Sequence, residues 1–503
     1  MSNAQAPALD RPRFDDRINP ILVKEVRQSL RGKYFKVLFW LTLCVGTLIG
    51  LSVVSNAALD DDSSETGRIF FMCIFGVLAA AVHGFVPFSA YLSTSAEWDE
   101  NTYDLLVISN LKPRQIVLGK LLSGLIQALL YYSTFGPFLV FAFLMNGIDL
   151  LSVAVILVGS GATCIALTLV GIATASLTSN KVGRVVIMAI FGAGLIGVWG
   201  MSMGLAGGIT FSPEDLRDVE GQVAVAAYVS AAALVGLLAT AVAMARFAHE
   251  EENRSTPLRV LSVLLVSAAV AWSAWMFGQF SEEGIVWACQ VIAAIACFLL
   301  SLFFQTEPEE LGRRVEKHMP KTTLLSLAIT PFHPGGGRAV LLWSLQAAIA
   351  ILGSQLALTF GTTTGSDRLD TFFAVASVWT YALIYAGLPS GIASFFVRGS
   401  TGRTFVRLGI LLAVPALALL PVLAGLFLGI REWMEFDHPF HPFWVLMKLG
   451  NSSGRSELHV VLVGLAFLGG LTLLVNVPRM WRGVREVATV NSRRSSSSAA
   501  SAQ

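Results

Sequence analysis

Long apolar runs alternate with short polar segments along the whole chain, and this alternation is the strongest pattern in the sequence. An α-helix needs about 20 apolar residues, at about 1.5 Å each, to cross a hydrocarbon core about 30 Å thick. The runs therefore predict an all-α, polytopic transmembrane helical bundle of about twelve spans. We place these spans at 37–55, 69–92, 119–145, 151–178, 185–207, 222–245, 260–279, 285–305, 339–360, 371–397, 408–430 and 459–478.

The composition also indicates a membrane protein. Of the 503 residues, 54% are hydrophobic and 14% are charged, and the mean hydropathy is +0.68. An average soluble domain carries about 25% charged residues. The first 36 residues are polar and basic, and the first apolar run is long enough to span. We therefore expect this run to remain as an anchor and not to be cleaved as a signal peptide.

Basic residues predict which ends of the helices face the cytoplasm. With twelve spans, both termini lie on the same face of the membrane. Nearly all of the 35 lysines and arginines then fall on that face. The exceptions are Arg68, Arg217, Arg368, Arg431, Lys448 and Arg455. The positive-inside rule therefore predicts a multi-pass protein of the cell inner membrane with both termini in the cytoplasm.

The span pattern divides the chain into two halves. We predict a cytoplasmic N-terminus over 1–36, a six-helix region over 37–250, a cytoplasmic junction over 251–259, a second six-helix region over 260–478 and a basic, Ser-rich tail over 479–503. The low-complexity end of this tail predicts disorder. Gly335, Gly336 and Gly337 lie in the longest inner loop without the Lys-Ser/Thr of a phosphate-binding loop, so we interpret them as a flexible linker.

The segment before the first span predicts an amphipathic helix that begins at Pro20. Asn19 is a good N-cap residue, and proline suits the first helical turn. Apolar and polar residues then separate onto opposite sides, as expected for a helix on the inner membrane surface. The apolar side is Ile18, Leu22, Val26, Leu30 and Tyr34, and the polar side is Lys24, Arg27, Gln28 and Arg31.

A second polar segment, residues 95–120, separates the second and third predicted spans. Residues 97–108 are helix-compatible, Ser109-Asn110 predicts a turn, and Pro113 suits the start of a new helix. A helix from Pro113 to Leu144 would be about 48 Å long, which exceeds the hydrocarbon thickness by more than about 15 Å. Unless a steep tilt absorbs the excess length, its lower end would project into the cytoplasm and present the turn to a soluble partner.

These two segments together resemble the ABC-2 family of ATP-binding-cassette transporter permeases. The first segment shares the Asn-Pro start and the basic helical residues that follow it. The second shares the charge, turn and spacing of the stretch after the second span, although Trp98, Glu100 and Asn101 depart from the family pattern. The matching residues are Asn19, Pro20, Lys24, Glu25, Arg27 and Gln28, and then Glu97, Asp99, Thr102, Asp104, Leu105, Leu106, Leu111, Ile116, Val117, Leu118, Gly119 and Lys120.

The resemblance implies an elbow helix and a pair of coupling helices that dock a motor subunit. The elbow residues would be Asn19, Pro20, Lys24, Glu25 and Arg27, and the docking residues Glu97, Asp99, Thr102, Asp104, Leu105 and Lys112. The sequence contains no GxxxxGK[ST] motif, so ATP and Mg²⁺ would bind to a separate nucleotide-binding ATPase subunit. Family analogy favours export. Twelve helices could supply both transmembrane halves of one transporter, but only the first half carries a visible dock, so we expect two copies of the chain per assembly, in contact with membrane lipids. We predict no enzymatic activity, cofactor or metal in this chain, and no nucleic-acid partner.

Two other functions compete with the permease interpretation. A secondary transporter usually needs ionisable residues in mid-membrane, whereas the charged residues in the predicted spans, such as Lys120, lie at span ends. His83 is the deepest histidine, and His83 with Gln127 is a possible intramembrane polar site. A membrane scaffold that docks an ATPase without transport is the other alternative, and an absence of ATP-driven flux would favour it.

Overall fold

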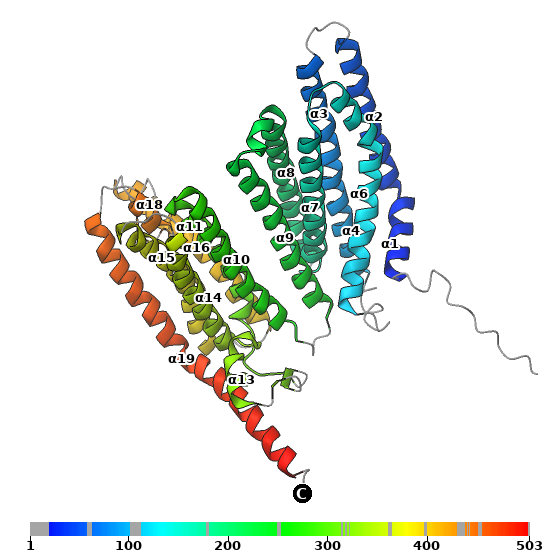
Figure 1. Ribbon diagram of the computed structural model, residues 1–503. Helices are drawn as coiled ribbons and strands as arrows, with labels where there is room; N and C mark the ends of the chain where they lie inside the picture. Colours follow the sequence, from blue (N-terminus) through cyan, green and yellow to red (C-terminus); the bar gives the residue numbers. More distant parts are fainter. Residues whose placement is uncertain are drawn as a thin grey trace, which may run out of the picture. The chain divides into compact units, whose positions relative to one another are not determined.

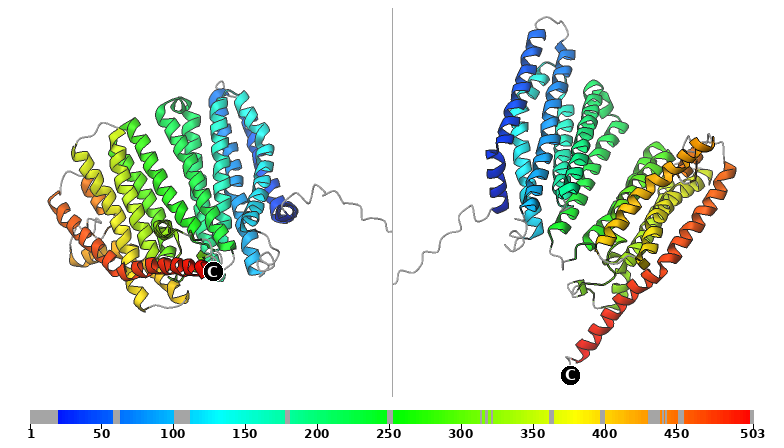
Figure 2. Two further views of the ribbon diagram at one scale, coloured as in Figure 1. Left: turned by 60° about the horizontal axis from the view of Figure 1, so that its bottom comes forward. Right: turned by 180° about the vertical axis from the view of Figure 1, so that it is seen from behind.

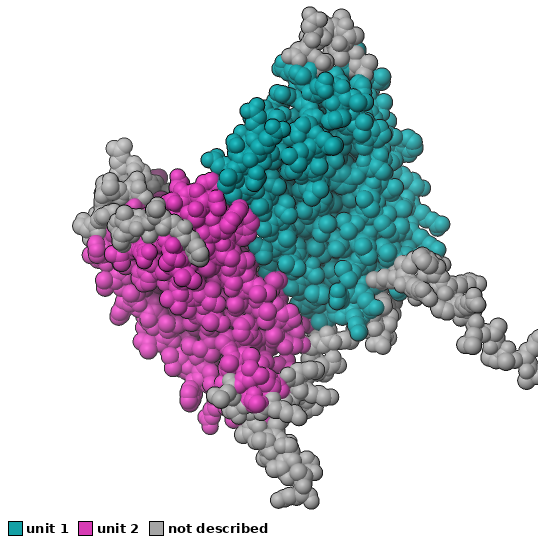
Figure 3. Space-filling view, viewed as in Figure 1, with its two compact units in different colours: residues 1–249 teal, residues 250–503 magenta. Residues whose placement is uncertain are grey.

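The structure, a computed structural model, describes residues 20–57, 63–100, 112–177, 181–248, 253–312, 315–316, 319–320, 322–360, 365–396, 400–429, 438–439, 441, 443–450 and 455–500. Within these ranges all regular secondary structure is helical, which confirms the all-α fold class. The chain forms two compact units, residues 1–249 and residues 250–503 (Figure 3).

Eleven helices among the described residues are long and apolar enough to cross a membrane. They coincide with eleven of the predicted spans, and this supports a multi-pass membrane protein. The remaining predicted span, 408–430, falls on the helix α16 (Ser400–Leu428), part of which lies outside the described side chains. The total of twelve spans stays a prediction.

Unit 1 consists of long helices that begin and end close to the predicted bounds (Figure 1). α6 runs unbroken from Pro113 to Leu144 and α1 begins at Pro20, as the proline positions predict. The elements are α1 (Pro20–Arg31), α2 (Lys33–Ala57), α3 (Ser63–Ala79), the π-helix η2 (Ala80–Phe85), α4 (Val86–Asp99), α6 (Pro113–Leu144), α7 (Leu150–Ala175), α8 (Lys181–Phe211), the 3₁₀-helix η3 (Pro213–Leu216) and α9 (Val219–Phe247).

α7 lies at the centre of unit 1 and packs against α4, α6, α8 and α9. Small residues allow this close packing, as expected between membrane helices. A Cβ at Gly171 would lie 2.7 Å from the carbonyl oxygen of Pro87 on α4, so a larger residue would force these two helices apart.

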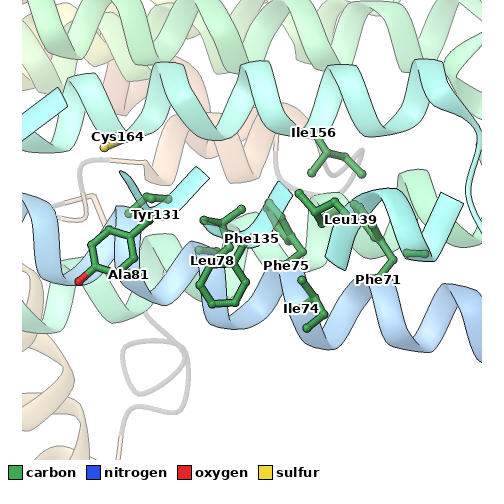
Figure 4. Close-up of a cluster of buried hydrophobic side chains, with 14 of the residues drawn as sticks. Phe71, Ile74, Phe75, Leu78, Ala81, Tyr131, Phe135, Leu139, Ile156 and Cys164 are labelled. Carbon is green, nitrogen blue, oxygen red and sulfur yellow. The ribbon is translucent and has the colours of Figure 1, made fainter. Parts of the chain in front are cut away.

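Aromatic and aliphatic side chains fill the space between α3, α6 and α7. Phe71, Phe75 and Leu78 of α3 meet Phe135 and Leu139 of α6 (Figure 4). In both general views α2, α3 and α6 lie side by side, coloured blue to cyan (Figures 1 and 2). Because lipid tails are as apolar as these side chains, close packing and not water exclusion holds this core together.

A π-helical segment joins α3 to α4 without a break. Pro87 has no N–H, so the carbonyl group four residues before it loses its usual α-helical donor. The chain widens here into η2, in which the Val86 N–H donates to the Ala81 carbonyl oxygen, five residues earlier. His83 therefore lies in a wider turn in the middle of a long helix.

Unit 2 is built around α15, which packs against α11, α14, α16 and α19. Its elements are α10 (Thr256–Phe280), α11 (Glu283–Phe304), α13 (Thr323–Ala328), η4 (Thr330–Phe332), α14 (Gly336–Ala357), η5 (Leu358–Phe360), α15 (Gly365–Phe396), α16 (Ser400–Leu428), α18 (Trp444–Gly450) and α19 (Arg455–Ala500).

The predicted disordered tail is wrong for most of its length, because α19 continues as a helix to Ala500. The last predicted span and residues 479–500 belong to one 46-residue helix. Val487 and Val490 of this extension pack against Leu311, Val315 and Met319 between α11 and α13. Apolar residues at helical spacing beyond the predicted span thus hold the extension to unit 2.

Candidate functional site

A cluster of four charged side chains joins α1, α4 and α6 in unit 1. Lys120 Nζ of α6 lies 3.0 Å from Glu25 Oε1 of α1 and 2.9 Å from Glu97 Oε2 of α4. Lys24 Nζ of α1 donates to Glu97 Oε1 at 3.0 Å. We call Lys24, Glu25, Glu97 and Lys120 the inner cluster. Its two positive and two negative charges balance.

The middle of the inner cluster is buried, whereas its edge is open. The side chains of Lys120 and Glu25 are 2% and 7% exposed, and that of Lys24 is 51% exposed. Burial alone would raise the pKa of Glu25, but the Lys120 ammonium and the Ser93 hydroxyl, which donates to Glu25 Oε2 at 2.8 Å, lower it overall. Glu25 is therefore ionised at neutral pH, and its charge is held inside the protein by Lys120.

The end of α4 is also fixed to α8 and α9. Asp99 forms an ion pair with Arg184 of α8, and Arg184 Nη1 also donates to the Ser95 carbonyl oxygen at 3.3 Å. Trp98 packs at a tilt against Phe247 of α9, with ring centroids 6.3 Å apart, and the Arg246 guanidinium lies 5.9 Å from the Trp98 ring. A displacement of the end of α4 would therefore act on four other helices.

The structure changes the role predicted for Glu97. We expected Glu97 to contact a docked subunit, but its side chain turns inward between two lysines and is 10% exposed. Glu25, which we grouped with a basic surface helix, is likewise on the buried face of α1 beside Ile21. Lys120, expected at a span end, is the centre of the buried cluster.

Other predicted residues keep an exposed position or lie outside the described residues. Arg27 is exposed, and Lys112 is exposed at the start of α6, where its backbone N–H donates to Gln115 Oε1 at 2.9 Å. Pro20 is the first described residue of α1. The remaining elbow and docking residues, Asn19, Thr102, Asp104 and Leu105, lie outside the described residues.

His83 and Gln127 do not form the single polar site that we predicted. His83 Nε2 lies 3.1 Å from the Ser160 carbonyl oxygen and lines a cavity of about 390 Å³ between η2, α7, α8 and α9. Gln127 Oε1 accepts from Ser89 Oγ at 3.2 Å and lines a different cavity of about 510 Å³ beside α1. His83 thus contacts α7 and Gln127 contacts α4, and the two side chains line different cavities.

Unit 2 contains a second charged cluster, which the sequence did not indicate. Arg259 and Arg338 are fully buried, and Arg479 is 4% exposed. Arg259 Nη2 lies 2.6 Å from Glu307 Oε2, and Arg479 Nη2 donates to the Gln305 carbonyl oxygen at 2.7 Å. We call Arg259, Arg338 and Arg479, together with the acidic residues Glu307, Glu309 and Glu486 that pair with them, the arginine cluster.

The glycine triplet belongs to this arginine cluster and is not a flexible linker. Gly335 has a φ of +139° and precedes α14, and its N–H donates to Glu307 Oε2 at 3.0 Å. A Cβ at Gly337 would lie 2.3 Å from the Arg479 carbonyl oxygen. The glycines are required because α14 begins in direct contact with the backbone of α19.

Comparison with protein-family models, curated proteins and solved structures finds no match for this chain.

Proposed function

We propose that the chain is the permease subunit of an ATP-binding-cassette transporter of the ABC-2 type, driven by a separate ATPase subunit. The observation that carries this proposal is the inner cluster, which joins the end of α4 and the start of α6 to α1. These helices border residues 101–111, the segment that resembles a motor dock. A force applied to that segment would pass directly into helices that cross the membrane.

Side-chain exposure supports a choice among the residues proposed to contact the motor. Glu97 acts within the permease by holding Lys24 and Lys120 together. Asp99 and Lys112 are the exposed docking candidates at the two ends of the segment, and Asp104 and Leu105 lie between them in the sequence. Movement of the segment would pull on α1 and α6 through the inner cluster, and on α8 through Arg184.

Co-purification with a P-loop ATPase tests the dock. The tagged full chain would be purified from its native host in mild detergent, and bound proteins identified by mass spectrometry. We expect wild type to retain an ATPase and Asp104→Arg/Leu105→Arg to lose it. Glu214→Arg is the matched control, because Glu214 is exposed on the predicted outer face. Equal recovery of the ATPase with all three forms would contradict the dock.

The role of the inner cluster is tested in the same complex. Glu25→Gln removes the charge that ties Lys120 to α1 but leaves the docking segment unchanged. We expect this variant to keep the ATPase, while the ATP-dependent change in maleimide labelling of the exposed Cys73 on α3 becomes smaller. An unchanged labelling response would show that force does not travel through Glu25.

A further inference from the structure

A cavity of about 510 Å³ lies in unit 1 between α1, the start of α2, α4 and α6. Small-molecule sites typically have volumes of about 300–1,000 Å³. The residues of α6 that line the cavity are Lys120, Ser123, Gly124, Gln127 and Tyr131, and their spacing places them on one face of the helix. This face is about 16 Å long at 1.5 Å per residue, so it reaches from the inner cluster towards the middle of α6.

Two hydroxyl groups on this face have no hydrogen-bond partner among the described residues. Ser123 is 4% exposed and Tyr131 is 1% exposed, yet neither side-chain oxygen bonds to the described protein. Neither oxygen is sealed among protein atoms, so the cavity is the space that each one borders. Figure 4 shows the Tyr131 hydroxyl at one edge of the buried apolar cluster, pointing away from the other labelled members. Buried polar groups ordinarily bond to a partner, so these two favour a ligand that supplies one.

Gln127 adds an amide group between the two hydroxyl groups. Its Oε1 accepts from Ser89 Oγ at 3.2 Å, and its Nε2 has no partner among the described residues. If the amide is turned the other way, the nitrogen donates to Ser89 and the oxygen is left instead. In both orientations one polar amide atom is available to the cavity. Ser123, Gln127 and Tyr131 follow one another at about 6 Å along α6, and they form a polar stripe.

The cavity offers no unpaired charge to a ligand. Glu25 and Lys120 are the only charged side chains among its described lining residues, and they pair with each other at 3.0 Å. A charged head group would therefore lose its hydration without gaining an opposite charge. The walls that face the polar stripe are largely apolar and include Phe35, Phe85 and Leu92. Such walls favour a hydrocarbon chain.

We propose that this cavity binds an uncharged amphiphile with a hydroxyl-rich head group and an alkyl chain. A hydroxyl group both donates and accepts, so it can satisfy Ser123, Tyr131 and either end of the Gln127 amide. An ammonium group can only donate, and a carboxylate can only accept. The head group would lie along the polar stripe of α6, and the chain would lie against the apolar walls. This inference does not depend on the proposed ATPase, because every residue that it uses belongs to the cavity.

Photocrosslinking with an alkyl glucoside tests the proposal. The full chain would be placed in phosphatidylcholine nanodiscs with octyl glucoside that carries a diazirine on its alkyl chain, and crosslinked peptides would be identified by mass spectrometry. We expect saturable crosslinking to the lining residues, displaced by plain octyl glucoside. Octylamine and octyl sulfate have the same chain but a charged head group, so we expect them to compete at least about tenfold more weakly. Equal competition by all three, or no saturable crosslinking, would overturn the proposal.

Removal of a single oxygen separates binding from folding. Tyr131→Phe deletes a hydroxyl that no described residue uses, so the unfolding temperature without ligand should not fall. Affinity for octyl glucoside should fall about fivefold, as when one hydrogen bond is lost. Tyr132→Phe is the matched control, because this neighbouring hydroxyl donates to Ser160 Oγ at 2.8 Å and Tyr132 does not line the cavity. It should lower the unfolding temperature and keep the affinity. Unchanged affinity in Tyr131→Phe would contradict the site.

A larger side chain at the start of the polar stripe places the ligand in this cavity. Ser123→Leu removes a hydroxyl and fills part of the space with hydrocarbon. We expect affinity to fall at least about tenfold, because part of the ligand then loses its burial. Ser133→Leu is the control, since Ser133 is exposed on the same helix and does not line the cavity. If Ser123→Leu bound octyl glucoside as well as Ser133→Leu does, the ligand would lie elsewhere and the proposal would fail.

Discussion

The two units hold their charged clusters together in different ways. In unit 1 the contacts are made by lysines, and Lys120 reaches Glu25 and Glu97 with a single ammonium group. In unit 2 the contacts are made by arginines, and Arg259 donates to Glu307 and also to the carbonyl oxygens of Pro331 and Gly335. An ammonium on a rotatable stem tolerates displacement, whereas a planar guanidinium fits one arrangement of acceptors.

The two clusters therefore differ in whether they keep their contacts when the surrounding helices shift. The inner cluster could keep its ion pairs while α1, α4 and α6 shift, since it uses few directed hydrogen bonds. The arginine cluster could not, because its guanidinium groups bind loop carbonyl oxygens and its glycines lie against the α19 backbone. The inner cluster is therefore the one suited to movement of its helices, and the arginine cluster is suited to a fixed arrangement.

Buried cysteines allow the stability of each unit to be measured separately. Cys164 is buried in unit 1 and Cys297 is buried in unit 2. With Cys44, Cys73 and Cys289 replaced by alanine, maleimide labelling of each remaining thiol during heating in detergent reports the unfolding of its own unit. The predictions below use this measurement.

Loss of the central lysine should have the largest effect. Lys120→Met leaves Glu25 facing an apolar side chain and removes the inner partner of Glu97, which keeps its outer partner, Lys24. Breaking a buried ion pair by removing one member costs about 3–5 kcal/mol, so Cys164 should become labelled at a much lower temperature. Cys297 should be unaffected.

A second substitution identifies the cause of that loss. Lys120→Met/Glu25→Gln removes the stranded charge, and Glu97 keeps Lys24. We expect this double variant to recover a large part of the lost stability. If it is as unstable as Lys120→Met alone, lost packing at residue 120 and not an unpaired carboxylate explains the effect.

An added methyl group should damage unit 2 next most severely. Gly337→Ala places a Cβ 2.3 Å from the Arg479 carbonyl oxygen, and that backbone atom cannot rotate away. Overpacking of this kind costs about 3 kcal/mol, and Cys297 should report the loss. Gly312→Ala is the control, because a Cβ at Gly312 meets no atom within 4 Å. Equal stability of both variants would mean that the arginine cluster is loosely packed.

The comparison also shows what the sequence can and cannot predict. Span positions follow from hydropathy alone, and the starts of α1 and α6 follow from Pro20 and Pro113, because proline acts on its own local backbone. The glycine triplet was misinterpreted because its requirement comes from Arg479, more than 140 positions later in the chain.

The candidate site was predicted less well because it too depends on contacts between residues far apart in the chain. The resemblance selected Glu25, Glu97 and Lys120, yet the direction of each side chain depends on how three helices pack. Charged residues at span ends are ordinarily solvated, so nothing local indicated that Lys120 would be buried. Arg184 was missed entirely, although a basic residue directly before a predicted span would have been a signal to consider.

Acid should destabilise unit 2. Burial and the neighbouring Arg338 and Arg259 lower the pKa of His333 to about 4, from an ordinary value of 6.5. The folded state therefore resists protonation, and stability falls as pH drops from 6.5 towards 4, by about 2 kcal/mol at pH 5. Glu25 has a pKa below its ordinary 4.5, so its contribution is present above pH 4.5 and is lost only in stronger acid.

Labelling of Cys297 between pH 7 and pH 5 measures this loss. Cys297 should become accessible at progressively lower temperatures over this range. His333→Asn should remove most of the slope from Cys297, because asparagine does not titrate. A slope that persists in His333→Asn would assign the pH dependence to another group.

The outer lysine of the inner cluster should have the smallest effect. The Lys24 side chain is 51% exposed, and Glu97 keeps Lys120 when Lys24 is removed. Lys24→Ala should therefore cost at most about 1 kcal/mol at low salt, and less at high salt, where solvent-exposed pairs are screened. Arg27→Ala, at an exposed position on the same helix, controls for the loss of a positive charge from α1. If Lys24→Ala were as damaging as Lys120→Met at every salt concentration, the four charges would act as one rigid unit, and the inner cluster would resemble the arginine cluster and not a movable connection.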